Sequence, residues 1–111
     1  MKPRLRYLAI LAMLAIGGCK GTTPIQTLLD DPGRFDKQKV RVAGTVGSAL
    51  SVMGYGAYTI NDGTGSLTVI SQQSGAPREG AEVGVEGEFR SAFTLGSQTA
   101  AVLMESKRFT P

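Results

Sequence analysis

The 111-residue chain contains no histidine and only one cysteine. Histidine is the most frequent general acid or base in catalysis and the commonest metal ligand. Without it, the chain cannot form most of the catalytic pairs in which a base activates a nucleophile. A single cysteine excludes an intramolecular disulfide. The chain also lacks a G-x-S-x-G nucleophile motif and the D-x-D-x-D-G spacing of a calcium loop. We therefore predict that the protein is not an enzyme and that it holds no metal and no cofactor.

The single cysteine follows a short apolar run at the N-terminus. Residues 7–16 are apolar, and Lys2, Arg4 and Arg6 precede them. This layout is typical of a secretory signal peptide, and the run is shorter than the roughly 20 residues that span a bilayer. Residues 16–19 read Ile-Gly-Gly-Cys and resemble the lipobox of bacterial lipoproteins. The resemblance implies a signal peptide over residues 1–18, a lipid such as palmitate on Cys19, and a tether over residues 19–23. A plain signal peptide or a membrane anchor with an unrelated cysteine is the alternative.

Removal of the signal peptide changes the charge balance. The whole chain has 12 basic and 9 acidic residues, and three of the basic ones lie in residues 1–18, which leaves 9 against 9. The basic character of the precursor is therefore no indication of a nucleic-acid partner. Lys20 follows the cysteine, where an aspartate tends to retain enteric lipoproteins at the inner membrane. The resemblance thus implies the periplasmic face of the outer membrane, or the cell membrane in an organism without an outer one.

A short helix is predicted at the start of the mature chain. Thr23, followed by a proline and then by Gln26, fits a capping box. Apolar residues follow at a spacing of three to four. Pro32 disfavours helix at the residue before it, so the helix is expected over residues 24–31.

From residue 39 onward the apolar residues recur with a period of two, which indicates half-buried strands. Four such runs lie near residues 40–46, 58–61, 66–69 and 82–90, and a fifth, near 99–107, is apolar on both faces as far as residue 104. Residues 62–65, Asp-Gly-Thr-Gly, predict a tight hairpin, and no helix-length segment separates any two runs, so the sheet should be antiparallel. The residues expected to be buried together are Val42, Val46, Ile60, Leu67, Val69, Val83, Val85 and Phe89.

Three motifs in these runs resemble those of OB-folds. They are V-x-V-x-G-x-V at residues 40–46, Y-x-I-x-D-x-T-G-x-L-x-V at 58–69 and P-x-x-G-x-x-V-x-V-x-G at 77–87. Similar strands occur in anticodon-binding domains, in periplasmic bacterial OB-fold proteins and in the haem chaperone of cytochrome c maturation. The resemblance implies an all-β, five-stranded barrel within a domain over residues 24–111. The chaperone attaches haem through a histidine that this chain lacks, and the usual helix between strands three and four has no room in residues 71–79.

OB-folds usually bind ligands across strands two and three, between the first–second and fourth–fifth loops. Here those loops are expected at residues 48–56 and 90–97. Their aromatic and basic residues, together with one arginine of the first strand, are the predicted ligand-binding set: Tyr55, Phe93, Arg90 and Arg41. The alternative is that the apolar side chains of these loops fold back and close one end of the barrel.

The predicted function is a lipid-anchored cell-envelope module that binds a protein or glycan partner. Binding of single-stranded nucleic acid is the alternative, and it requires aromatic platforms and a cationic groove. The outward positions of strands two and three are neither aromatic nor basic, and the fourth strand carries a stripe of glutamates. These positions are Thr59 and Asn61 on strand two, Ser66 and Thr68 on strand three, and Glu82, Glu86 and Glu88 on strand four.

The lipidation prediction is tested by the mass of the protein extracted from its host membrane. We expect a form that begins at Cys19 and carries lipid, because the basic, apolar and small-residue segments all precede that cysteine. Replacement of Cys19 by alanine should release the protein from the membrane or stall its processing. A mature form that begins elsewhere, or that keeps residues 1–18, would contradict the prediction.

Overall fold

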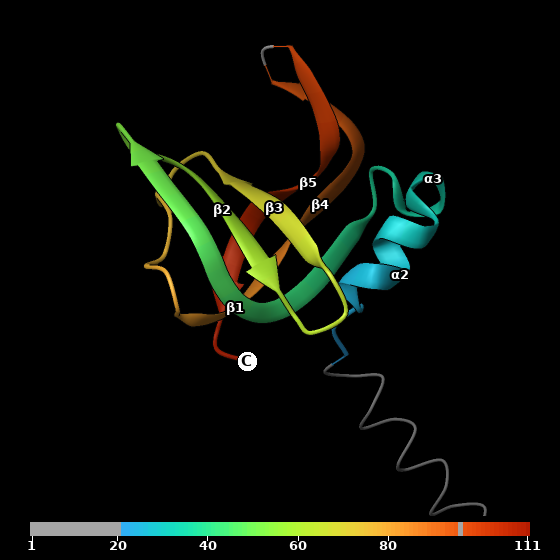
Figure 1. The fold of residues 1–111 in the computed structure, drawn as a ribbon, viewed down its shortest axis with the longest axis horizontal. Coiled ribbons are helices and arrows are strands. Elements are labelled where there is room, and N and C mark those ends of the chain that lie inside the picture. The colour runs from blue at the N-terminus through green and yellow to red at the C-terminus, as the bar shows by residue number, and fades with distance from the viewer. Residues whose placement is uncertain (1–20, 96) are drawn as a thin grey trace, which may run out of the picture.

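The chain folds into a small β-barrel with two short helices at its N-terminal end (Figure 1). The structure is a computed structural model, and it describes residues 21–95 and 97–111. The predicted signal peptide and Cys19 lie outside the described residues. Helices α2 and α3 come first, and five strands follow. Their bounds are Ile25–Asp30 for α2, Pro32–Phe35 for α3, Lys39–Val52 for β1, Tyr55–Asn61 for β2, Ser66–Ser71 for β3, Glu82–Leu95 for β4 and Gln98–Phe109 for β5.

The five strands form a closed barrel in the order β1-β2-β3-β5-β4. All neighbours are antiparallel except β3 and β5, which are parallel. The predicted all-β, five-stranded OB-fold barrel is therefore confirmed. None of the helices in the described part of the chain is long and apolar enough to cross a membrane.

Strand β1 pairs with two different strands, which closes the barrel. Residues Lys39–Thr45 pair with β4, and residues Thr45–Val52 pair with β2. Gly44 lies where the partner changes, and a Cβ atom at this position would stand 2.3 Å from the carbonyl oxygen of Asn61. Only glycine allows this approach, as expected for a bend within a strand. In Figure 1, β1 curves from the helices at one side of the barrel to the free tip of the β1–β2 hairpin.

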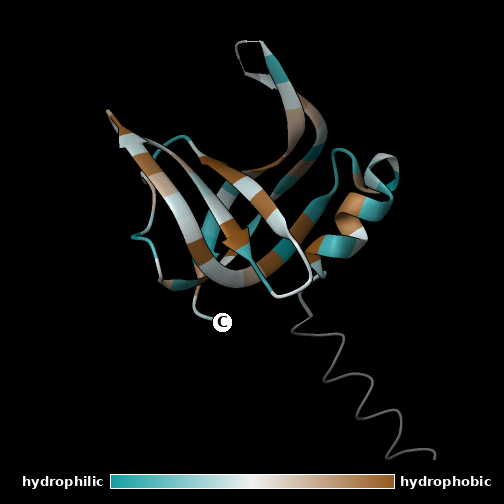
Figure 2. Ribbon diagram, viewed as in Figure 1, coloured by the Kyte–Doolittle hydropathy of each residue, from teal (hydrophilic) through white to brown (hydrophobic). Residues whose placement is uncertain are grey.

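The core is formed by the inward faces of the strands and one face of α2. Figure 2 shows the corresponding alternation of apolar and polar residues along the strands. Of the eight residues predicted to be buried together, seven are buried, and Val83 is only half-buried and packs against the others. The buried cluster comprises Ile25, Leu28, Val40, Val42, Val46, Tyr58, Ile60, Leu67, Val69, Val85, Phe89 and Leu103.

The predicted capping box of the first helix is wrong. Thr23 donates its backbone N–H to the carbonyl of Arg41 at 2.7 Å, so it belongs to the edge of β1 and not to the helix. Helix α2 has no side-chain cap of its own. Its first free N–H groups are satisfied by the turn between β2 and β3. Asp62 accepts from the N–H of Ile25 at 2.9 Å, and Thr64 accepts from the N–H of Gln26 at 3.1 Å.

Asp62 also holds its own turn together. Its carboxylate accepts from the backbone N–H groups of Thr64 and Gly65 and from the Thr64 hydroxyl. Partial burial raises the pKa of Asp62, but these hydrogen bonds and that from Ile25 outweigh burial, so the pKa lies below its ordinary value. The predicted Asp-Gly-Thr-Gly hairpin is confirmed, with Gly63 at a φ of 89°. The helix itself ends one residue early, and Pro32 starts α3 rather than a loop.

The two segments expected to be loops, residues 48–56 and 90–97, are largely strand. β1 runs to Val52 and β2 begins at Tyr55, so only Met53 and Gly54 form the turn, both with positive φ. β4 continues to Leu95 and pairs there with Gln98 of β5. The two long hairpins therefore project from the barrel as arms, which we name the first arm (residues 47–57) and the second arm (residues 91–95 and 97–101).

Truncation of Phe89 to alanine should destabilise the protein by about 3–5 kcal/mol, because this ring is fully buried in the core. Thermal and urea unfolding measure the effect. Leu50→Ala is the control, since its side chain is 65% exposed and should change stability by less than about 0.5 kcal/mol. A Phe89→Ala variant that melts within a degree or two of the parent protein would show that the strand faces are wrongly assigned.

Candidate functional site

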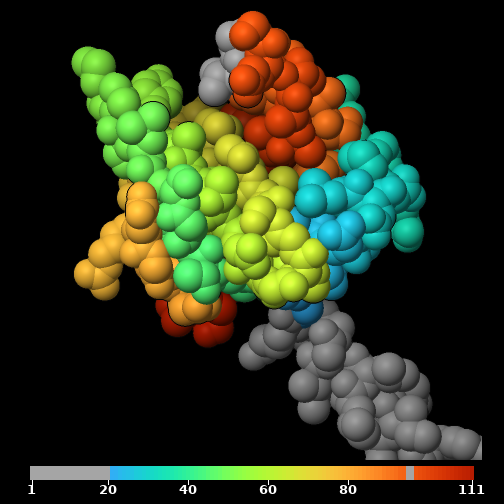
Figure 3. Space-filling model, in the orientation of Figure 1, coloured from blue at the N-terminus to red at the C-terminus, as the bar shows by residue number. Residues whose placement is uncertain are grey.

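An apolar groove of about 460 Å³ lies between the two arms. Its floor is the outward face of β2 and β3, which the space-filling view shows between the projecting arms (Figure 3). The groove brings together Tyr55 and Phe93, as the sequence predicts, although these residues lie 38 positions apart. The residues that line it are Leu50, Val52, Tyr55, Gly56, Ala57, Ile70 and Phe93.

The lining side chains of the first arm are exposed to solvent rather than folded into the barrel. Leu50, Val52 and Tyr55 are 65%, 55% and 60% exposed, and Met53 at the tip is 93% exposed. Phe93 is half-buried on the opposite wall. The alternative in which these residues close the end of the barrel therefore does not describe the first arm. Contiguous exposed apolar side chains in a groove are typical of an interaction surface.

The floor of the groove follows from strand register. Leu50 is paired with Ala57, and Ala57 is paired with Ile70, so these three residues form one row across β1, β2 and β3 on the outward face. Ile70 and Ala57 were not among the residues predicted to bind ligand. The alternation that places Ile60 and Val69 inside the barrel already places Ala57 and Ile70 outside it, so this signal was available in the sequence.

The loop between β3 and β4 supports the first arm from its other side. Ala76 donates its backbone N–H to the Ser51 hydroxyl at 2.8 Å, and Gly75 donates to the Gly54 carbonyl at 3.0 Å. A Cβ atom on Gly56 would stand 2.3 Å from the backbone of Gly75. This loop occupies the place where other OB-folds were expected to have a helix.

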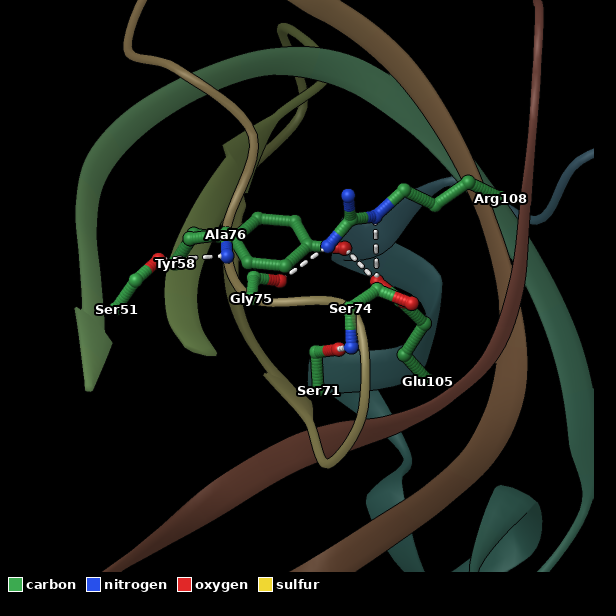
Figure 4. A network of polar contacts seen from close by, with 8 residues as sticks. All are labelled: Ser51, Tyr58, Ser71, Ser74, Gly75, Ala76, Glu105 and Arg108. Atoms are coloured by element: carbon green, nitrogen blue, oxygen red, sulfur yellow. Dashed lines mark hydrogen bonds and ion pairs between the residues drawn. The ribbon is translucent and has the colours of Figure 1, made fainter. Parts of the chain in front are cut away.

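A buried polar network anchors that loop to the barrel (Figure 4). Arg108 donates to the Gly75 carbonyl and, at 3.0 Å, to the Glu105 carboxylate, which also accepts from the Tyr58 hydroxyl. The Glu105 side chain is only 4% exposed. Burial raises the pKa of Tyr58, and the hydrogen bond to Glu105 raises it further. Arg108 thus joins the Gly75 carbonyl of the loop to the Glu105 carboxylate of the barrel. The network therefore positions the loop and, through the loop, the first arm.

The second arm is held at its base by the segment after α3. Asp36 accepts from the backbone N–H of Ser91 at 2.8 Å, and this hydrogen bond lowers the pKa of Asp36. The pairing of β4 with β5 shifts between Arg90 and Phe93, which indicates a bulge. Arg90, a predicted ligand residue, lies before this bulge and forms an ion pair with Glu88. It does not line the groove, although Phe93 does.

Arg41, the other predicted basic ligand residue, lies away from the groove. Its guanidinium stacks on the ring of Phe109, with 4.0 Å between its carbon and the ring centroid, and lies 3.6 Å from the Glu86 carboxylate. Glu86 also faces Lys39 at 3.7 Å, and its side chain is 16% exposed. Within the stripe of glutamates on β4, Glu86 is therefore ion-paired and largely buried, whereas Glu82 is exposed.

The groove thus offers apolar contact and no charge. None of its lining residues is ionisable at neutral pH. In residues 21–95 and 97–111, no group of three or more Asp, Glu, His or Cys side chains is placed to hold a metal ion. The geometry suits the burial of an apolar segment of another molecule.

Comparisons with known proteins give the fold. No protein-family model matches the chain, and no curated protein matches it significantly. Asparaginyl-tRNA synthetase from Pyrococcus horikoshii is similar to 68% of this chain at 22% identity, with a TM-score of 0.55. The same synthetase complexed with asparaginyl-adenylate gives 69% coverage, 21% identity and a TM-score of 0.55. In both, the match covers 20% of the synthetase chain.

OBody AM3L09, in a structure bound to hen egg-white lysozyme, is also similar. The match has 15% identity and a TM-score of 0.54, and it covers 68% of this chain and 83% of the OBody. At these identities the likeness shows the fold alone, an OB-fold-like five-stranded barrel. This agrees with the expected resemblance to anticodon-type OB-folds. None of these matches bears on the lipoprotein prediction or on the haem chaperone.

Replacement of Tyr55 or Phe93 by alanine should leave the melting temperature within about 2–3 °C of the parent, because neither ring is in the core. The matched control is Tyr58→Ala on the same strand, which removes a fully buried ring and should cost about 3–5 kcal/mol. The melting temperatures of the three variants are measured by calorimetry. A loss of many degrees in Tyr55→Ala would show that the first arm packs as core.

Proposed function

We propose that the protein is a lipid-anchored binding module of the bacterial cell envelope whose groove receives an apolar segment of a protein partner. The observation that supports the proposal is the groove itself, in which exposed Leu50, Val52 and Tyr55 face Phe93 without any charged side chain. Ordered strands, rather than loops, hold these residues. A preformed apolar surface loses little conformational entropy on binding. A glycan is the second candidate, since Tyr55 and Phe93 are suited to stack on a sugar ring.

A protein partner fits the groove better than a glycan. Sugars need hydrogen-bonding groups beside the aromatic ring, and the groove walls are almost entirely apolar side chains. The similar OBody was observed bound to a protein, lysozyme. Aromatic side chains are often energetically dominant in protein interfaces. The proposed energetic centre is therefore the pair Tyr55 and Phe93, together with Leu50 of the same groove.

Nucleic acid is the alternative partner. The similar synthetase is named for its action on tRNA, which is the observation in favour. Against it, no arginine or lysine lines the groove. Phosphate binding depends on such residues and is strongly weakened by salt. The two basic residues once expected there, Arg41 and Arg90, are each close to a glutamate.

The anchor is proposed from the sequence, at Cys19, on the periplasmic face of the outer membrane or on the cell membrane of an organism that has only one. The described chain begins beside the β2–β3 turn, where Asp62 caps α2. Tyr55 lies at the other end of β2, about 20 Å away for a strand of this length. In Figure 1 the two arms likewise point away from residues 21–24. With lipid on Cys19, the groove would open away from the membrane.

The proposal is tested by a photo-crosslinking amino acid placed at Tyr55 in intact cells. We expect a discrete protein adduct that is lost when Leu50→Ser is added, because that change makes the groove polar without disturbing the core. Asn61, exposed at the opposite end of β2, is the control position and should give no such adduct.

Two results would contradict this function. One is an adduct at Tyr55 that survives Leu50→Ser, which would place the contact outside the groove. The other is micromolar binding of single-stranded DNA or RNA by the full chain that weakens steeply with salt, which would establish the alternative.

A further inference from the structure

The apolar groove continues into a second part on the same face of the barrel. We name it the polar part after its hydroxyl side chains, Ser48, Thr59 and Thr68, although most of its surface is still apolar. Leu50 and Ala57 line both the apolar groove and an adjoining cavity of about 260 Å³. In this second part Thr59 is paired with Thr68, and Thr59 accepts a hydrogen bond from the backbone N–H of Ser48 at 3.0 Å. The two parts are therefore successive rows of the same strands, first apolar and then polar.

Glu79 lies at the far end of the polar part. It is the only charged residue among those that line the two parts. The backbone on its C-terminal side is fixed to β1, because Gly80 donates to the Val46 carbonyl and Val46 donates to the Ala81 carbonyl, each at 2.8 Å. Within the described residues Glu79 has no ion-pair partner, unlike Glu86, Glu88 and Glu105. The carboxylate makes one end of an otherwise uncharged groove negative, so a bound segment with a charged end would have one preferred orientation.

We propose that the groove binds an extended polypeptide segment in which two apolar side chains are followed by a lysine or arginine that pairs with Glu79. This inference rests on the proposed function and specifies its partner. The rows marked by Tyr55, Ala57 and Thr59 are two residues apart along β2, which pairs with β1, so each step is about 6.7 Å. An extended segment lying along β1 presents its side chains at the same interval. The expected pattern is apolar-x-apolar-x-basic, with the basic residue over the polar part.

The charge and the shape together select this occupant. A phosphate chain would meet a carboxylate and no compensating cation. A glycan would find hydrogen-bonding groups only in the polar part, beside Ser48, Thr59 and Thr68. A basic side chain, in contrast, has an apolar stem that suits the Leu50–Ala57 row and a charged end that suits Glu79.

The experiment uses the full chain in lipid nanodiscs and fluorescent ten-residue peptides. The peptides carry leucine, valine or phenylalanine at the two apolar positions, and lysine, glutamine or glutamate at the fifth, with serine and glycine elsewhere. Anisotropy titration should show lysine peptides binding roughly threefold tighter than glutamine peptides, the effect of one exposed ion pair, and glutamate peptides binding weakest.

Variants of Glu79 then test the assignment. Glu79→Gln should abolish the preference for lysine, and Glu79→Lys should reverse it in favour of glutamate peptides. The matched control is Asp31→Asn, which removes the same charge at an exposed position between the helices and should leave the preference intact. Leu50→Ser should weaken all three peptides alike.

The outcomes separate the inference from the function on which it rests. If all peptides bind equally and Leu50→Ser abolishes binding, the groove takes apolar protein segments but the role of Glu79 is wrong. If no peptide binds, or if soluble peptidoglycan fragments bind in their place, both the inference and the protein-partner proposal are overturned.

Discussion

The architecture depends on the pairing of β1 with two different strands, one after the other along its length. Its first half is paired with β4 and its second half with β2, and Gly44 allows the close contact with Asn61 where the partner changes. Because the second half leaves β4, it can extend with β2 beyond the barrel as the first arm. That extension supplies one wall of the groove and most of its exposed apolar side chains, and its base borders the polar part. A side chain at position 44 would force β1 away from β2 at Asn61 and disturb the base of the first arm.

Much of this fold was predictable from local patterns, and the site only in part. The period of two gave the inward faces correctly, because a strand buries every second residue regardless of its distant partners. The capping of α2 was not predictable in this way, since its acceptor, Asp62, is 37 residues away from Ile25. The sequence predicts loops where the arms lie, because glycines and small residues obscure the alternation of Leu50 and Val52. Residue type alone places Arg41 with Tyr55 in a binding set, whereas in the structure Arg41 stacks on Phe109.

The exposed first arm carries a risk of self-association, which the rest of the molecule reduces. Apolar side chains on a projecting hairpin favour self-association, particularly where the outer edge of a strand lacks a partner. The loop through Gly75 covers part of that edge by hydrogen bonds to Ser51 and Gly54. The cost of burying Glu105 beside the partly exposed Arg108 is then understandable, since this pair fixes the loop. Buried charged groups often specify one arrangement more than they stabilise it, and here the arrangement is that of the arm.

The distant cap of α2 also affects the order in which the chain folds. A helix of six residues without a cap of its own is unstable in isolation, since nucleation outweighs the few hydrogen bonds formed. Its cap becomes available only when the β2–β3 turn has closed. Until that turn has closed, the segment that precedes the barrel lacks acceptors for its first N–H groups and stays extended. It becomes helical only after β2 and β3 have paired, so the N-terminal helix is among the last elements of the fold to form rather than a nucleus for it.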